Sequence, residues 1–215
     1  MQRVPLIETM ICRSKERGVL TPEKVKTLFA LPDWPATRRA INMLAYSTGM
    51  RLGEILALRR AAFHVDEGYV EVEVSWDRAT KSVKSTKTRK ARFVPVPSNV
   101  GALLTELIAR SPYQATHDFI FAGRRRNHPL DRKIVERMLF RMLAATGIDE
   151  PQRATRNITF HSARYFFNSL LLNRGIPDLK VKALTGHATD KMMGHYYHPG
   201  DFKDVAAVSE TLFSD

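Results

Sequence analysis

Cysteine is almost missing from this sequence of 215 residues. Cys12 stands alone, which excludes an internal disulfide and a cysteine-based zinc site and is typical of a reducing compartment. Long apolar runs are missing too: no stretch of about 18 uncharged apolar residues occurs, so the sequence predicts no membrane span. Residues 1 to 11 hold one basic residue and no sustained apolar core, which excludes a recognisable secretory signal. We therefore expect a cytoplasmic protein.

Acidic residues are few relative to basic ones. Lysine and arginine number 34, aspartate and glutamate 22, and the formal net charge is +12. Such a bias predicts an anionic partner, with nucleic acid first and an acidic membrane second. The apolar share of 44% is ordinary for a folded protein. The length suits one domain with a substantial core and short appendages.

Apolar residues recur at helical spacing through most of the chain. Thr21 followed by Pro22 is typical of a helix start, whereas Gly49, Gly147 and Gly186 follow periodic segments as helix stops. The pattern predicts helices over about residues 22 to 31, 36 to 48, 51 to 58, 98 to 108, 131 to 145, 159 to 175, 179 to 185 and 205 to 212.

Two segments indicate strands. Residues 69 to 74 alternate apolar and acidic side chains, as a strand with one wet face does, and residues 93 to 97 form an apolar strand. Between them, residues 78 to 92 carry seven basic residues and no acidic one, which indicates an antiparallel sheet with a basic edge. We therefore expect a mainly α fold with a small antiparallel β-sheet (α+β).

Two short motifs contain an arginine beside a possible partner. Arg51 directly follows a helix stop, and Glu54, one turn later, is suited to orient its guanidinium. His161 and Arg164 lie three apart at a helix start and share one face, which suits a phosphate: the guanidinium binds two oxygens and the imidazole acts as donor or base. Taken singly, each motif is better explained by a solvated surface pair.

Residues 186 to 198 place two adjacent phenols, Tyr196 and Tyr197, among three imidazoles. A phenol has an unperturbed pKa of about 10, so as a nucleophile it needs cationic neighbours or a base. The imidazoles also raise the alternative of a metal site. However, Asp190 is the only acidic residue of this stretch, and zinc sites need three or four converging ligands, so we expect no metal.

Further basic residues lie in two loops and are expected to contact DNA phosphates, with plain solvation as the alternative for each. They are Lys84, Lys87, Arg89, Lys90 and Arg92 in the first loop, and Arg124, Arg125 and Arg126 in the second.

In their order along the chain, these pieces resemble the catalytic domain of the tyrosine recombinases, the phage integrase family. Residues 48 to 54, Thr-Gly-Met-Arg-Leu-Gly-Glu, resemble the first arginine box of the family. Lys87, eight positions before Pro95, falls where the family keeps a lysine on a β-hairpin.

The later motifs complete the resemblance, which covers roughly residues 20 to 200. Residues 161 to 164, His-Ser-Ala-Arg, resemble the His-x-x-Arg motif, and residues 184 to 187 end in the Gly-His pair of the Leu-Gly-His motif. Tyr196, nine positions after His187, falls where the family has its nucleophile, with Tyr197 as the alternative.

The resemblance implies the tyrosine recombinase catalytic-domain fold and a site-specific recombinase acting on double-stranded DNA. Tyr196 would attack a phosphodiester to form a 3′-phosphotyrosyl link and release a 5′-hydroxyl. Lys87 would protonate the leaving oxygen, and His161 would take the proton of the tyrosine or hold it in position.

The other residues implied by the resemblance stabilise charge. Arg51, Arg164 and His187 would bind the phosphate oxygens on which negative charge builds, with Glu54 supporting Arg51. No cofactor or metal is needed, because the covalent intermediate keeps the bond energy for rejoining.

The resemblance also bears on domains and assembly. We expect residues 1–20 to be a lead-in segment, 21–200 the catalytic domain and 201–215 a tail helix. The family's N-terminal DNA-clamping domain is expected to be absent from this chain, whether removed or naturally missing. A free monomer is expected to become a tetramer on nucleoid DNA, with Val205, Val208 and Leu212 of the tail packing on a neighbouring protomer. The alternative is that the tail folds back on its own domain.

Two other functions fit the same residues. One is a DNA-binding protein that keeps this fold without catalysis, although such a protein has no need of every polar group named above. The other is a type IB topoisomerase or a resolvase-like strand transferase, which uses the same site in a different assembly.

Overall fold

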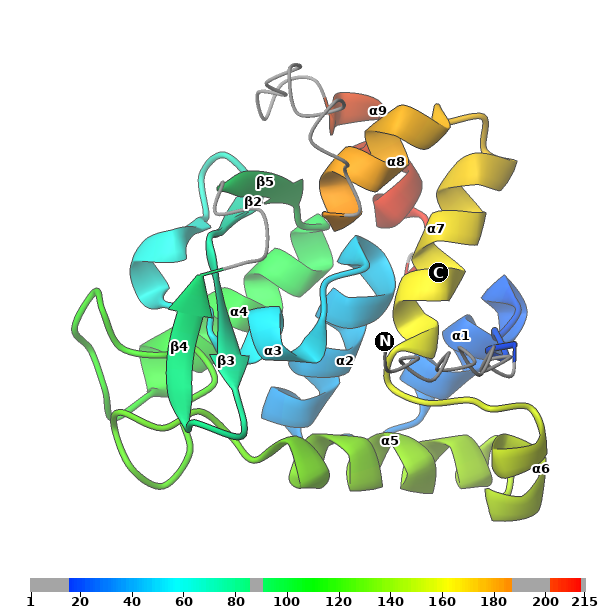
Figure 1. Ribbon diagram of the computed structural model, residues 1–215, viewed down its shortest axis with the longest axis horizontal. Helices are drawn as coiled ribbons and strands as arrows, with labels where there is room; N and C mark the ends of the chain where they lie inside the picture. Colours follow the sequence, from blue (N-terminus) through cyan, green and yellow to red (C-terminus); the bar gives the residue numbers. More distant parts are fainter. Residues whose placement is uncertain (1–15, 86–90, 187–201, 214–215) are drawn as a thin grey trace, which may run out of the picture.

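The computed structural model describes residues 16–85, 91–186 and 202–213. Helices form most of it, with small antiparallel sheets at one side (Figure 1), which confirms the expected fold class. The helices are α1 (Pro22–Ala30), α2 (Ala36–Thr48), α3 (Leu52–Leu56), η1 (Arg60–Ala62), α4 (Ser98–Arg110), α5 (Arg132–Ala145), α6 (Glu150–Thr155), α7 (Ser162–Asn173), α8 (Asp178–Thr185) and α9 (Lys203–Glu210). The strands are β1 (Phe63–His64), β2 (Tyr69–Val72), β3 (Val74–Asp77), β4 (Ser82–Ser85) and β5 (Arg92–Pro95).

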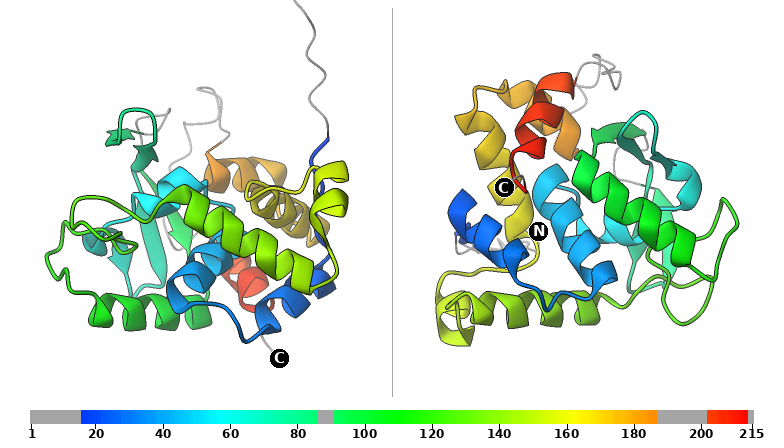
Figure 2. Two further views of the ribbon diagram at one scale, coloured as in Figure 1. Left: turned by 90° about the horizontal axis from the view of Figure 1, so that it is seen from below. Right: turned by 180° about the vertical axis from the view of Figure 1, so that it is seen from behind.

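Helix α2 is the centre of the bundle. Its residues from Ala40 to Thr48 are all buried, because α4, α5 and α7 pack around it. In Figure 1 it stands between α3 and α7, with α5 running beneath, and Figure 2 shows α4 and α9 on the opposite side. The helix ends at Gly49, whose left-handed φ of 65° turns the chain toward α3. The best-packed helix therefore fixes the position of Arg51.

The strand expected over residues 69 to 74 is divided. β2 ends at Val72 and pairs with β5, whereas Val74 begins β3, which pairs with β4 in a separate sheet. The alternation of apolar and acidic side chains continues through Glu73, so the periodicity did not reveal the break. The antiparallel pairing of the 69–72 and 92–95 segments agrees with the expected sheet.

The β3–β4 hairpin lies close against α3. Gly53 permits this approach, because a Cβ at that position would lie 2.6 Å from Ser75 Oγ and 3.0 Å from the carbonyl oxygen of Trp76. A side chain larger than hydrogen at residue 53 would separate the hairpin from α3.

Three other helix predictions need correction. The sequence interpretation missed α6, although Asp149 caps it through a hydrogen bond from Gln152 N of 2.9 Å. The third helix ends at Leu56 and not at Leu58. The long helix expected from residue 159 starts at Ser162, whose hydroxyl accepts a hydrogen bond from Thr159 N.

Helix α9 packs against its own domain. The hydroxyl of Ser209 donates to the carbonyl oxygen of Ser47 on α2, 3.1 Å away, and Val205 is buried with residues of α7 and α8. The carboxylate of Glu210 accepts hydrogen bonds from Ser98 N and Oγ, at 2.6 and 2.8 Å. Exchange of this helix between protomers stays a prediction, because a single chain does not test it.

Candidate active site

The Arg51 guanidinium is fixed by the residue one turn further along. Arg51 precedes α3, and its backbone N–H donates to Glu54 Oε2 at 2.9 Å while its Nη1 donates to Glu54 Oε1 at 3.0 Å. Glu54 is 2% exposed, whereas the Arg51 side chain is 39% exposed. The buried carboxylate therefore holds the guanidinium while leaving part of it open to a ligand, as the sequence interpretation expected of Glu54.

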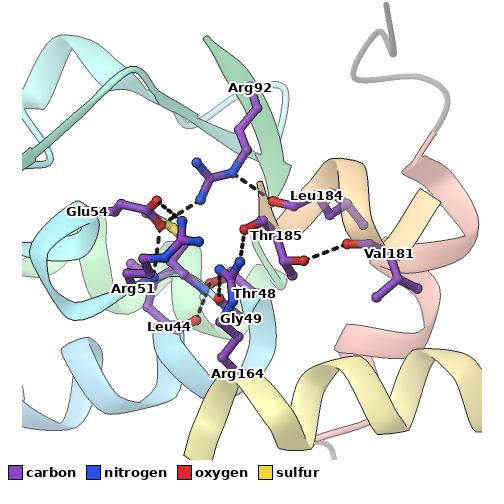
Figure 3. Close-up of polar contacts among 11 residues, drawn as sticks. Leu44, Thr48, Gly49, Arg51, Glu54, Arg92, Arg164, Val181, Leu184 and Thr185 are labelled. Atoms are coloured by element: carbon purple, nitrogen blue, oxygen red, sulfur yellow. Dashed lines mark hydrogen bonds and ion pairs between the residues drawn. The ribbon is translucent and has the colours of Figure 1, made fainter. Parts of the chain in front are cut away.

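Arg92 meets the same carboxylate from the opposite side. Its Nη2 donates to Glu54 Oε2 at 2.6 Å, and its Nε donates to the carbonyl oxygen of Leu184 at 2.7 Å (Figure 3). Its side chain is only 14% exposed. The expected position of Arg92 on a solvent-facing basic edge is therefore wrong, because strand β5 turns this residue inward.

Arg164 is held by backbone carbonyl groups. Its Nη1 donates to the carbonyl oxygen of Gly49 at 2.9 Å, and its Nη2 donates to that of Thr185. The residue is 1% exposed and lies in the first turn of α7, with its guanidinium between the ends of α2 and α8 (Figure 3). Both acceptors are carbonyl groups at helix C-termini, where the helix dipole favours a cation.

Gly186, the C-terminal cap of α8, lies beside two of these arginines. It has a left-handed φ of 66°, and a Cβ there would lie 3.5 Å from Arg92 Nη1 and 3.7 Å from Arg51 Nη1. The next residue, His187, lies outside the described residues. The described stretch that ends at Gly186 therefore ends next to the guanidinium groups.

The cluster carries an excess of positive charge. Among the described residues it unites the guanidinium groups of Arg51, Arg92 and Arg164 around the carboxylate of Glu54. Burial by itself raises the pKa of the Glu54 carboxyl, but the charge and hydrogen bond of Arg92, together with Arg51, lower it below its ordinary value. Glu54 is therefore ionised. Its single negative charge does not balance the three guanidinium groups, so the cluster is suited to bind an anion.

The electrostatics of Arg164 point the same way. Burial, followed by the positive charge of Arg51, lowers the pKa of the Arg164 guanidinium to about 9. Glu54 opposes this effect without cancelling it. A phosphate bound beside these groups would supply the missing negative charge and favour the protonated guanidinium.

His161 lies directly before α7, one turn from Arg164, as the sequence interpretation expected. Its imidazole packs edge-on against the ring of Tyr165, with 5.5 Å between ring centroids. Arg164 lies three positions after His161, in the first turn of α7. The start of α7 therefore positions both side chains.

Several expected site residues cannot be placed. Lys87, Arg89, Lys90, His187 and Tyr196 all lie outside the described residues, as does Tyr197. Their roles stay predictions.

The exposed basic residues divide into engaged and solvent-facing groups. Lys84 forms an ion pair with Asp77 across the β3–β4 hairpin. Arg126 forms two hydrogen bonds, of 2.7 and 3.0 Å, with Asp118, so this arginine stabilises its own loop. Arg124 and Arg125 are exposed. Contacts of these residues with DNA stay predictions.

A cleft of about 430 Å³ opens beside Arg51. It runs between α3 and the β3–β4 hairpin and reaches the start of α5; its lining includes Arg51, Arg78, Lys84 and Arg132. The basic groups therefore continue from the arginine cluster along an open surface.

The described part of the chain offers no group of three or more side chains suited to hold a metal ion. The described helices also include none long and apolar enough to cross a bilayer.

Sequence reasoning misjudged Arg92, although a signal was present. Alternate residues of a strand share one face, and Val94, two positions after Arg92, is fully buried. Strand β5 pairs Arg92 with Val72 and Val94 with Val70 of β2, and both of these valines are also buried. This alternation predicts Arg92 on the inner face of the sheet. The basic residues on either side of Arg92 instead favoured the prediction of an exposed basic edge.

Known proteins resemble this chain in sequence and in fold. Residues 18–202 match the phage integrase family. The chain belongs to that family. The tyrosine recombinase XerC of Nitrobacter winogradskyi is 33% identical over 151 residues, which cover 70% of this chain and 42% of that protein. The chain spans about half the length of the curated relatives it matches.

Solved structures of integrases share the fold. A structure of the Tn1549 transposon integrase in complex with circular intermediate DNA superposes with a TM-score of 0.68 at 16% identity, covering 86% of this chain and 64% of that one. A lambda integrase tetramer bound to a Holliday junction gives a TM-score of 0.59 at 22% identity, covering 88% and 52%. These likenesses establish a tyrosine recombinase catalytic-domain fold.

Proposed function

We propose that this chain is the catalytic part of a site-specific DNA recombinase that cleaves and rejoins strands through a 3′-phosphotyrosyl intermediate. The observation that carries the proposal is the pairing of Arg51 and Arg92 with the buried carboxylate of Glu54, while the carbonyl groups of Gly49 and Thr185 hold Arg164 beside them. Preorganised cations are the main requirement for a phosphoryl transfer, in which charge builds on the non-bridging oxygens.

In the proposed reaction, the phenolic oxygen of Tyr196 attacks the phosphorus of a DNA phosphodiester. The bond to the 5′-oxygen breaks, Lys87 gives that oxygen a proton, and His161 takes the proton of the tyrosine. Arg51 and Arg164, with His187 as a further donor, bind the non-bridging oxygens. Attack by a 5′-hydroxyl on the phosphotyrosine reverses these steps and rejoins a strand.

The proposed substrate is double-stranded DNA, and the proposed active assembly is a tetramer formed on it. The net charge of +12 supports the first part, since phosphate neutralisation gives tight and salt-dependent binding. The lambda integrase tetramer on a Holliday junction, which has the same fold, supports the second. We also propose that the protein acts in the cytoplasm, where its nucleoid substrate lies.

A nicked suicide duplex tests the proposal. After cleavage, the short fragment that carries the released 5′-hydroxyl diffuses away, so the strand cannot be rejoined and the covalent adduct accumulates. We expect the unaltered chain to form the adduct on duplexes that contain its site, drawn from a library of DNA sequences. Tyr196→Phe should abolish the adduct and leave DNA affinity nearly unchanged, whereas Tyr197→Phe should keep it. Complete lack of an adduct across the library would refute the recombinase proposal, and the reverse behaviour of the two variants would reassign the nucleophile.

A further inference from the structure

Arg92 connects three parts of the site that are distant in sequence. It is the first residue of β5, and it bonds both to Glu54 on α3 and to Leu184 near the end of α8. These partners lie 38 and 92 positions away in the chain. The side chain of Arg92 therefore connects strand β5, which follows the first basic loop, to both α3 and α8.

The contacts of Arg92 reach Arg51 through Glu54. The Oε2 atom of Glu54 accepts from Arg92 Nη2 at 2.6 Å and from the backbone N–H of Arg51 at 2.9 Å. The Oε1 atom accepts from Arg51 Nη1 at 3.0 Å. A shift of the Glu54 carboxylate would therefore move the guanidinium of Arg51 with it.

This geometry sets Arg92 apart from a side chain that grips DNA from the surface. Two of its donor groups are engaged inside the protein and the side chain is 14% exposed, compared with 53% for Lys84 on the nearby hairpin. Loss of the guanidinium would leave the carboxylate of Glu54 with one cationic partner instead of two among the residues that the structure describes. A lysine would not replace it, because a single ammonium lacks the planar fork that reaches two acceptors in different directions.

We propose that Arg92 is a positioning residue for DNA cleavage, which sets the guanidinium of Arg51 through Glu54 and fixes the end of α8 beside it. The inference rests on the proposed recombinase function. It assigns Arg92 to the rate of the chemical step and not to the affinity for DNA.

The test measures two quantities separately: the dissociation constant for a duplex containing the site over a range of salt concentrations, and the single-turnover rate of adduct formation at saturating DNA. Arg92→Ala and Arg92→Lys are compared with Arg110→Ala, which removes one positive charge as Arg92→Ala does. Arg110 is a matched control because it lies on α4 with a side chain 75% exposed, paired only with Glu106 among the described residues. Thermal melting checks that each variant is folded.

We expect both Arg92 variants to lose about 100-fold in adduct rate, since a displacement of about 1 Å at a reacting group has an effect of this order. Their DNA affinity should stay within about twofold of that of Arg110→Ala. A contact between Arg92 and a DNA phosphate would do the opposite: weaker affinity, a salt slope smaller by about one, and an unchanged rate at saturation. That result, or full activity of Arg92→Lys, would overturn the inference.

Glu54→Gln tests whether Arg92 influences the adduct rate through Glu54. If Arg92 acts through Glu54, the double variant Arg92→Lys/Glu54→Gln should be no slower than the slower single variant. If the losses in adduct rate of the two single variants multiply in the double variant, Arg92 and Glu54 act independently, and the proposed action through Glu54 is wrong. Because Arg92→Lys keeps the charge and most of the volume, it decides the question also where Arg92→Ala is too unstable to assay. An unaltered chain that forms no adduct would instead refute the proposed function itself.

Discussion

The guanidinium of Arg164 donates a hydrogen bond to the carbonyl oxygen of Gly49, 2.9 Å away, although 115 positions separate the two residues in sequence. A second bond runs to the carbonyl oxygen of Thr185. Both acceptors belong to the backbone, so their presence does not depend on which side chains stand at residues 49 and 185. What they require is a donor group of the right shape, and a planar fork satisfies both at once.

Arg164→Lys is therefore expected to be far from conservative. A single ammonium cannot bond both carbonyl groups and still face a phosphate, so the adduct rate at saturating DNA should fall by about 100-fold to 1,000-fold. Suicide-substrate kinetics measure the change. Arg174→Lys, an exposed substitution just after α7, serves as control and should keep the normal rate. Comparable rates for the two variants would exclude a direct role of Arg164.

Gly49→Ala is expected to destabilise the fold more than Gly147→Ala. Both glycines have positive φ angles, 65° and 86°, so an alanine at either position adds a backbone strain of about 1–2 kcal/mol. Only at Gly49 would the added Cβ also collide, since it would lie 2.7 Å from Phe167 Cδ1, whereas nothing lies within 4 Å at Gly147. Overpacking of this kind costs about 1–3 kcal/mol more. Urea unfolding gives both values, and equal losses would contradict the expected clash.

The lowered pKa of Arg164 predicts a titration at accessible pH. Burial and the charge of Arg51 lower this pKa from its ordinary value to about 9, so the guanidinium should lose its proton as the pH rises through about 9. The unfolded chain keeps the proton to higher pH. The folded state is therefore penalised below about pH 9, and this penalty shrinks as the pH rises from about 9 toward the ordinary pKa of arginine.

Carbon-13 NMR of labelled arginine guanidinium groups measures this titration directly. One resonance should titrate near pH 9, and it should be missing from Arg164→Lys. Bound duplex DNA should raise its midpoint, because a phosphate favours the charged form. If every arginine stays protonated across the range, the low pKa is wrong.

Cross-linking tests whether α9 is exchanged between protomers on DNA. Cysteines in place of Ser98 and Glu210, whose polar atoms lie 2.6 Å apart, report on the docking of α9 when joined by a short bismaleimide in a Cys12→Ser background. We expect cross-links within one chain without DNA, and covalent multimers on DNA that contains the site. Cross-links within one chain under both conditions would show that the tail stays on its own domain.

Local signals in the sequence were enough for most helices but not for the sheet. Caps and stops such as Thr21, Gly49 and Gly186 act within one turn, so they could be interpreted without knowing the fold. The break between β2 and β3 follows from pairing with different partners, and residues 69 to 74 hold no information on those partners.

The candidate site shows the same difference between local contacts, which the sequence predicts, and distant contacts, which it does not. The contact between Arg51 and Glu54 spans three positions and was foreseen, whereas the engagement of Arg92 depends on α8, 92 positions away. Arg126 likewise seemed one of three equal charges, until its partner Asp118 distinguished it from Arg124 and Arg125. A count of charges cannot tell which cations the fold turns inward.

The separation of these contacts along the chain also has a consequence for folding kinetics. The bonds of Arg92 to Leu184 and of Arg164 to Gly49 close loops of 92 and 115 residues, and contacts of such sequence separation form late because their loop-closure entropy must be overcome first. A nascent or misfolded chain therefore already has its net charge of +12, which under the proposed function attracts DNA, while its arginines are not yet assembled into a site. Under the proposed function, the capacity to break a DNA strand would arise only when folding is complete.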